Sequence, residues 1–285
     1  MINCSDAMEA DVILLSANYD RTSSFGKGAD KGPAAILECL GTQIEIFERF
    51  SRAAPANRLK IAHIDLGNLN RLSPEKMVDK VESELRRHYK SGRFVVLLGG
   101  EHSVSNAAFR AIASPDVTVV QIDAHADMRE DDSDYNEKPF GRYAHSCVMR
   151  RAYELGLRTV QIGLRAYSKE EYDFMKQNRL TFFEWSGKVP PINTIINSIR
   201  TGKVYLTLDV DGIDPAHMPA TGTPVQGGLE WYYVNELIRR IFLKKNAIAA
   251  DIVEVAPVPG SRLTEYGAAQ LCYNMIAWKF ADRHY

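Results

Sequence analysis

The sequence predicts an α/β fold, a three-layer α/β/α arrangement with a doubly wound, mostly parallel sheet of about eight strands. Short runs rich in Val, Ile and Leu alternate with segments of helical period, which is typical of repeated βαβ units. The apolar runs have no polar alternation, as expected for strands buried on both faces. Connections are short, and no linker-like stretch interrupts residues 1–285, so we expect a single domain.

The first half of the chain supplies four expected strands, at residues 11–19, 59–66, 94–98 and from 117 onward. A helix opens at Gly32-Pro33, with proline near its favoured first position, and is expected to run to about residue 50. A second helix starts after Ser73-Pro74. Its apolar residues keep a helical period: Met77, Val78, Val81 and Leu85.

The second half continues the alternation. Strands are expected at residues 159–164, 181–183, 204–210 and 248–255, with 181–183 as a short edge strand. Ser168 and Glu171 match a capping box that begins a helix. Further helices are expected at 192–200, at 229–243, and after Thr264 as an N-terminal cap.

Composition excludes several functions. The formal net charge of −1 gives no electrostatic footprint for nucleic acid or an anionic membrane. No stretch approaches the ~20 apolar residues that span a bilayer, and the N-terminus has no signal-peptide pattern. The cysteines are far apart, which favours reduced thiols: Cys4, Cys39, Cys147 and Cys272. We expect a cytoplasmic protein with a small-molecule partner.

Metal-capable side chains follow three of the expected strands. His102 follows residues 94–98. The fourth strand ends in Asp123, His125 and Asp127, and the strand at 204–210 ends in Asp209 and Asp211. Carboxyl ends of parallel strands share one sheet edge, where α/β folds bind ligands. Alone, each residue could be a cap or turn residue. Together, carboxylates 4 Å apart repel by ~4 kcal/mol at an effective dielectric near 20, so the cluster requires cations.

Two divalent ions would balance the four carboxylates. Oxygen-rich ligation with two imidazoles and no thiolate suits Mn²⁺ better than a structural zinc. A hydroxide shared by two such ions is a nucleophile at neutral pH, so the predicted chemistry is hydrolysis.

At this point the sequence resembles the ureohydrolases, the family of arginase and agmatinase. The resemblance is carried by five motifs in the family's order: Gly99-Gly-Glu-His-Ser103, Asp123-Ala-His-Ala-Asp127, Leu208-Asp-Val-Asp-Gly-Ile-Asp-Pro215, Ala220-Thr-Gly-Thr-Pro-Val-Gln-Gly-Gly228 and Asp251-Ile-Val-Glu-Val255. It implies one arginase-like ureohydrolase domain over residues 1–285, in a family that commonly forms trimers or hexamers. The family usually has Asp where this chain has Glu101.

The resemblance also implies roles. One Mn²⁺ would be held by His102, Asp123, Asp127 and Asp209. The other would be held by His125, Asp123, Asp209 and Asp211, so that Asp123 and Asp209 bridge. Glu254 falls where the family grips the guanidinium, His145 matches its proton carrier, and Asp127 relays the nucleophile's proton.

Two features typical of arginases are missing. The central motif continues into an acidic loop, residues 130–134, instead of a loop rich in Thr, Ser and Asn. Gly163-Leu-Arg165 is followed by Ala166, where arginases have acidic residues. The acidic loop would favour a cationic tail, although a solvated surface loop explains it equally well. We therefore expect an agmatinase, which converts agmatine to putrescine and urea.

Alternatives remain open at this stage. Within the family the substrate could be N1-aminopropylagmatine, guanidinobutyrate, arginine or formimidoylglutamate. Outside it, the chain could be a non-catalytic member of the fold or a mononuclear zinc amidohydrolase. The last alternative needs fewer carboxylates than the sequence supplies.

Overall fold

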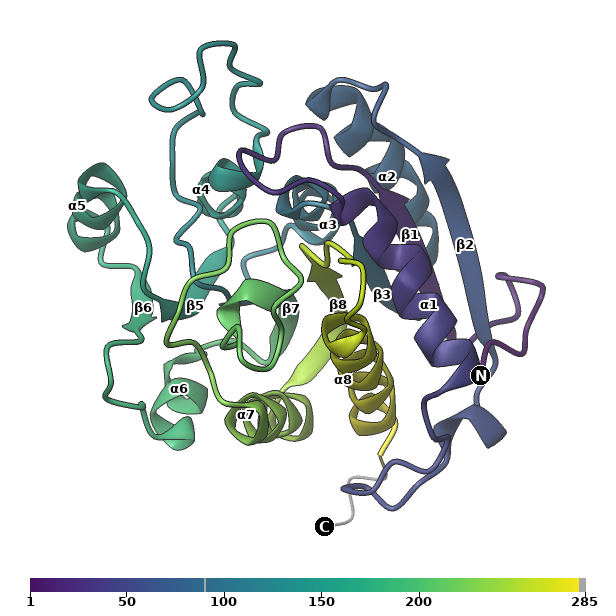
Figure 1. Ribbon diagram of the computed structural model, residues 1–285. Coiled ribbons are helices and arrows are strands. Elements are labelled where there is room, and N and C mark those ends of the chain that lie inside the picture. Colours follow the sequence, from purple (N-terminus) through teal and green to yellow (C-terminus); the bar gives the residue numbers. More distant parts are fainter. Residues whose placement is uncertain (90, 282–285) are drawn as a thin grey trace.

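The computed structural model describes residues 1–89 and 91–281 and confirms the α/β class (Figure 1). Its eight strands form one sheet in the order β2-β1-β3-β8-β7-β4-β5-β6, and every pair in that order is parallel. The strands are β1 (Val12–Asn18), β2 (Ile61–Asn68), β3 (Phe94–Gly99), β4 (Val117–Ile122), β5 (Arg158–Leu164), β6 (Thr181–Glu184), β7 (Lys203–Asp209) and β8 (Asn246–Val253).

Helices cover both faces of the sheet (Figure 1). One face carries α1 (Gly32–Thr42), α6 (Ile192–Ser198), α7 (Trp231–Lys244) and α8 (Leu263–Lys279). The other carries α2 (Pro74–Tyr89), α3 (Ser105–Ile112), α4 (Val148–Glu154) and α5 (Lys169–Gln177). The period of two along each strand divides the core between these layers. In β1, Val12 and Leu14 pack on the α1 side, and Ile13 and Leu15 pack on the α2 side.

Three details differ from the sequence prediction. Helix α1 ends at Thr42, because the chain then folds into a compact loop around Glu48. This buried carboxylate accepts backbone N–H groups from Phe50 (2.8 Å) and Ser51 (2.6 Å). Helix α3 was not predicted; it is short and opens with Ser and Asn, which are weak helix formers. Thr264 does not cap α8. Its hydroxyl accepts the backbone N–H of Ala220 (2.8 Å) and so fixes a loop above the sheet.

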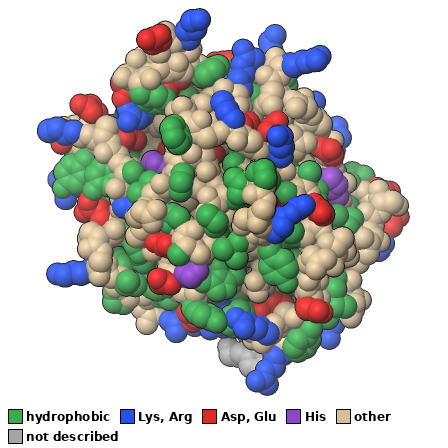
Figure 2. Space-filling view, viewed as in Figure 1, with side chains coloured by type: hydrophobic (Ala, Val, Ile, Leu, Met, Phe, Trp, Pro, Cys, Tyr) green, Lys and Arg blue, Asp and Glu red, His purple; other side chains and the backbone are tan. Residues whose placement is uncertain are grey.

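The surface agrees with the balanced charge of the sequence. In the view of Figure 2, acidic and basic side chains are interspersed and form no broad patch of one sign. Over the described ranges 1–89 and 91–281, no helix has both the length and the apolarity to cross a membrane.

Candidate active site

The carboxyl ends of four neighbouring strands bring the predicted residues together. Strands β3, β8, β7 and β4 are consecutive in the sheet, and each is followed by predicted site residues. They open into a cavity of about 460 Å³. Seven of the eight predicted residues line it: His102, His125, Asp127, His145, Asp209, Asp211 and Glu254. The eighth, Asp123, is fully buried beside them.

His102 lies at the centre of an enclosed group of ligands. Its Nδ1 is 3.1 Å from Asp123 Oδ2, 3.1 Å from Asp127 Oδ2 and 3.4 Å from Asp209 Oδ2. Among the described residues, this buried nitrogen has no hydrogen-bond partner. The imidazole nitrogen and one carboxylate oxygen each from Asp123 and Asp127 lie within 4.8 Å of one another, as the ligands of a cation do, and Asp209 adjoins them.

A second, more open group lies beside it. His125 Nδ1 is 3.0 Å from Asp211 Oδ2 and 3.6 Å from Asp123 Oδ1. The side chain of His125 is 30% exposed, against 1% for His102. Asp123 thus turns one oxygen to each group, which is the geometry that a bridging ligand requires. Asp209 turns its Oδ2 toward His102, whereas its Oδ1 accepts the backbone N–H of Asp211 (2.9 Å), so its bridging role stays a prediction.

The charge of the cluster fits divalent cations. Burial, together with neighbouring Asp123, raises the pKa of Asp127 to about 7. Burial, Asp211 and Asp123 also raise the pKa of Asp209. For Asp123, burial acts in the same direction, but the imidazoles of His102 and His125 outweigh it and its pKa falls. Without metal, these carboxyl groups compete for protons. A hard divalent ion with oxygen and nitrogen ligands would displace the protons and relieve the repulsion.

Two of the site residues have left-handed backbone conformations. Asp127 has φ 51° and Glu254 has φ 65°. Such positions cost ~1–3 kcal/mol and persist where the surrounding structure enforces them. The carbonyl of Asp127 accepts the N–H groups of Met149 (3.0 Å) and Arg150 (3.1 Å), at the start of α4. Glu254 N donates to the carbonyl of Gly100 (2.8 Å). Neighbouring strand ends and helices therefore fix how both carboxylates enter the site.

Glu254 is held ready for a cationic group. It is buried, and its Oε1 accepts the backbone N–H of His102 at 2.7 Å. Burial raises its pKa well above the usual range, and the nearby carboxyl of Glu101 adds to this. A guanidinium beside it would favour the ionised form through a charge-assisted pair.

His145 lies beside Glu101, whose role the sequence did not reveal. Its Nδ1 lies 3.4 Å from Thr22 Oγ1 and 3.7 Å from Glu101 Oε2. Glu101 is fully buried and accepts hydrogen bonds from Thr22 N (3.0 Å) and Ser103 Oγ (3.0 Å). Burial lowers the pKa of His145 to about 4, so the imidazole is neutral and able to accept a proton. The signal in the sequence was the glutamate where the family usually has aspartate.

The acidic loop had two equally weighted interpretations, a partner for a cationic tail and a solvated surface loop, and its aspartates lie outside the cavity lining. Asp132 is fully buried and accepts the backbone N–H groups of Phe140 (3.0 Å) and Gly141 (2.7 Å). Asp131 accepts the N–H of Ser133 (2.9 Å), and Asp134 pairs with Arg129. None of these three described aspartates lines the cavity. They organise the loop itself.

Other residues, which the sequence did not single out for binding, complete the wall of the cavity. They are Ser24, Arg129, Tyr135, Ser146, Ala166, Tyr167, Ser168, Glu171 and Thr223. Glu171 is the carboxylate among them. It was predicted only as part of a capping box, which the structure confirms. Its Oε1 accepts Met128 N (2.9 Å) and its Oε2 accepts Ser168 N (2.7 Å), so it is fixed in the wall.

Arg129 adds a positive charge to the same wall. Its guanidinium lies 5.1 Å from the ring centroid of Tyr135 and forms an ion pair with Asp134. Glu171 Oε2 is 3.9 Å from its Nε. The two charged residues that line this part of the wall, Arg129 and Glu171, balance formally, and Asp134 pairs with Arg129 from outside the lining.

Comparisons with known proteins agree with this geometry. A model of the arginase family matches residues 10–277. The chain is 38% identical over 283 residues to the N(1)-aminopropylagmatine ureohydrolase of Synechocystis sp., covering 95% of this chain and 89% of that protein. It is 31% identical over 258 residues to the agmatinase of Bacillus anthracis, covering 88% and 85%.

Solved structures show the same architecture. The agmatine ureohydrolase of Thermoplasma volcanium superposes with a TM-score of 0.84 at 32% identity, covering 95% of this chain and 90% of that one. The family match spans nearly the whole chain, and the strand ends converge as its motifs require. The chain therefore belongs to the arginase family, the ureohydrolases.

Proposed function

We propose that this enzyme hydrolyses the guanidino group of a substrate with a cationic tail, releasing urea and an amine. One observation carries the proposal: two adjoining groups of metal-capable ligands and a buried glutamate, Glu254, face one cavity. A glutamate buried at such a site needs a cationic partner, and a guanidinium supplies a planar one.

The residues of the site have separate roles in the proposed reaction. The six predicted ligands would hold two divalent ions, with Mn²⁺ as first candidate, which supply a nucleophile at neutral pH. Glu254 grips the guanidinium and orients its carbon. Asp127, whose Oδ2 lies 3.1 Å from His102 Nδ1, accepts a proton and passes it to the leaving nitrogen. Neutral His145, held by Thr22 and Glu101, carries the remaining proton.

The far wall of the cavity supports a cationic tail. The Arg129 guanidinium is already paired with Asp134, and Glu171 presents the carboxylate of this wall, which favours an ammonium over a carboxylate. A substrate carboxylate would compete with Asp134 for Arg129. Agmatine, the substrate predicted from sequence, meets these requirements and would give putrescine.

N1-aminopropylagmatine meets them as well, and one observation favours it: the relative at 38% identity is named for this substrate. We therefore rank N1-aminopropylagmatine first and agmatine second.

A direct assay tests this ranking. Urea release is measured from N1-aminopropylagmatine, agmatine, arginine and guanidinobutyrate, with formimidoylglutamate followed by formamide release. A substrate carboxylate must displace Asp134 from Arg129 or stay unpaired at a cost of several kcal/mol, so kcat/KM for arginine should be lower by ~100-fold or more. Arginine or formimidoylglutamate as best substrate would overturn the cationic-tail proposal and leave the metal centre intact.

A further inference from the structure

A chain of buried side chains supports His102 from the side opposite the cavity. His102 Nε2 is 2.9 Å from Thr207 Oγ1, on β7. Thr207 Oγ1 is 2.6 Å from Asp251 Oδ1, on β8. Thr207 and Asp251 are fully buried, and neither is among the six predicted ligands. The chain thus connects a metal ligand to a carboxylate inside the sheet.

The direction of the hydrogen bonds follows from what Asp251 can accept. Its Oδ2 accepts from Ser105 Oγ (2.7 Å) and Tyr205 OH (2.8 Å). An ionised carboxylate only accepts, so Thr207 gives its single hydroxyl proton to Oδ1. The Thr207 oxygen can then only accept from the His102 ring. His102 must therefore carry a proton on Nε2.

A proton on Nε2 leaves the other ring nitrogen available. In the neutral imidazole, Nδ1 then presents a lone pair, and this is the atom that faces Asp123 and Asp127 at 3.1 Å each. A lone pair among carboxylate oxygens is repelled unless a cation lies between them. The hydrogen-bonded relay from Asp251 through Thr207 to His102 therefore selects the tautomer of His102 that binds a metal ion.

We propose that Asp251, acting through Thr207, is a positioning residue for the enclosed half of the metal centre. Without Asp251, the Thr207 hydroxyl can turn and donate to Nε2, which moves the ring proton to Nδ1. A proton there competes with the cation. This inference rests on the metal centre of the proposed function but does not depend on the substrate.

Four variants distinguish a hydrogen-bonded relay to His102 from a buried polar cluster that only stabilises the fold. Thr207→Val keeps the shape of the side chain and removes the relay. Thr207→Ser keeps the hydroxyl. Ser105→Ala is the matched control, because it removes a hydrogen bond to the same carboxylate outside the path to His102. Asp251→Asn removes the charge with little change in size.

The measurement is Mn²⁺ affinity of metal-stripped full-length protein by titration calorimetry, with circular dichroism and thermal melting as checks of folding. Loss of outer-shell partners typically weakens metal binding 10–100-fold. We expect this loss at one of two sites for Thr207→Val and Asp251→Asn, and less than ~3-fold for Thr207→Ser and Ser105→Ala.

Three results would overturn the proposal. They are wild-type affinity in both Thr207→Val and Asp251→Asn, an equal loss in Ser105→Ala, or failure of Thr207→Ser to retain binding. If Thr207→Val does not fold, the proposal is tested by comparing the Mn²⁺ affinity of Asp251→Asn with that of Ser105→Ala. Wild-type protein that binds no Mn²⁺ would instead overturn the proposed function and the relay together.

Discussion

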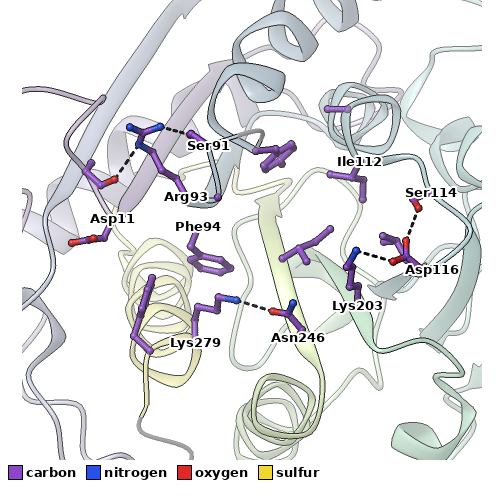
Figure 3. Close-up of a pocket in the computed structure, with 17 residues that line it drawn as sticks. Asp11, Ser91, Arg93, Phe94, Ile112, Ser114, Asp116, Lys203, Asn246 and Lys279 are labelled. Atoms are coloured by element: carbon purple, nitrogen blue, oxygen red, sulfur yellow. Dashed lines mark hydrogen bonds and ion pairs between the residues drawn. The ribbon is translucent and has the colours of Figure 1, made fainter.

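The two ends of the sheet each carry a cavity, and the two cavities differ in charge as well as in size. The cavity at the amino ends of the strands is the larger, about 580 Å³ against about 460 Å³. Figure 3 shows that three of its basic side chains already have partners. Lys203 pairs with Asp116 at 2.7 Å, Lys279 donates to Asn246 at 2.9 Å, and Arg93 donates to the carbonyl of Ala10 at 3.1 Å.

At the carboxyl ends, charges of one sign are brought together and buried. His102 and Asp123 are almost fully enclosed, whereas the Lys203 and Asp116 side chains are 49% and 56% exposed. An exposed pair contributes little to stability. Buried carboxylates, by contrast, persist only with a partner that compensates them. Unbalanced buried charge therefore identifies the functional end of this sheet, and volume does not.

The largest effect on activity is expected from substitutions of the predicted metal ligands at the carboxyl ends of the strands. Asp209→Ala and His102→Ala should each lower kcat/KM by more than the ~10–100-fold typical of outer-shell changes. If Asp209 bridges, its loss should also remove more metal than the loss of His102, which is a terminal ligand. Metal analysis with steady-state kinetics checks both. Equal metal loss in the two variants would count against the bridging assignment.

A smaller effect is expected at Glu254. Glu254→Gln keeps the size of the side chain and the acceptor for His102 N, but it removes the charge that pairs with a guanidinium. Such pairs contribute ~1.5–3 kcal/mol, so kcat/KM should fall at least ~10-fold while the metal content stays unchanged. Unchanged kinetics would assign Glu254 a structural role.

The smallest effect is expected at the opposite end of the sheet. Lys203→Gln breaks the pair with Asp116 in the larger cavity. Exposed pairs contribute ~0–1 kcal/mol, so the free energy of unfolding should change by no more than this and kcat/KM should stay within ~2-fold. Chemical denaturation and the same kinetic assay provide the test. A substantial loss of activity would show that the amino-end cavity also serves the reaction.

The sequence predicted the parts of the molecule that local patterns encode. Parallel strands buried on both faces appear as apolar runs, and a ligand at a strand end is visible as a polar residue after such a run, as at His102 and Asp209. Long-range packing has no such pattern. Glu171 reaches the cavity because α5 starts beside it, and Thr207 meets Asp251 because β7 and β8 are neighbours. The sequence left the role of Asp132 open, and the structure shows it buried as an acceptor within its own loop.

The central claim is that two adjoining ligand groups hold two divalent ions. It is tested most directly by metal content after metal-stripped protein is loaded with Mn²⁺ and exchanged into metal-free buffer. We expect two Mn²⁺ per chain, since the His102 and His125 groups share Asp123 and each has its own imidazole. A stoichiometry that never exceeds one per chain would contradict the dinuclear centre.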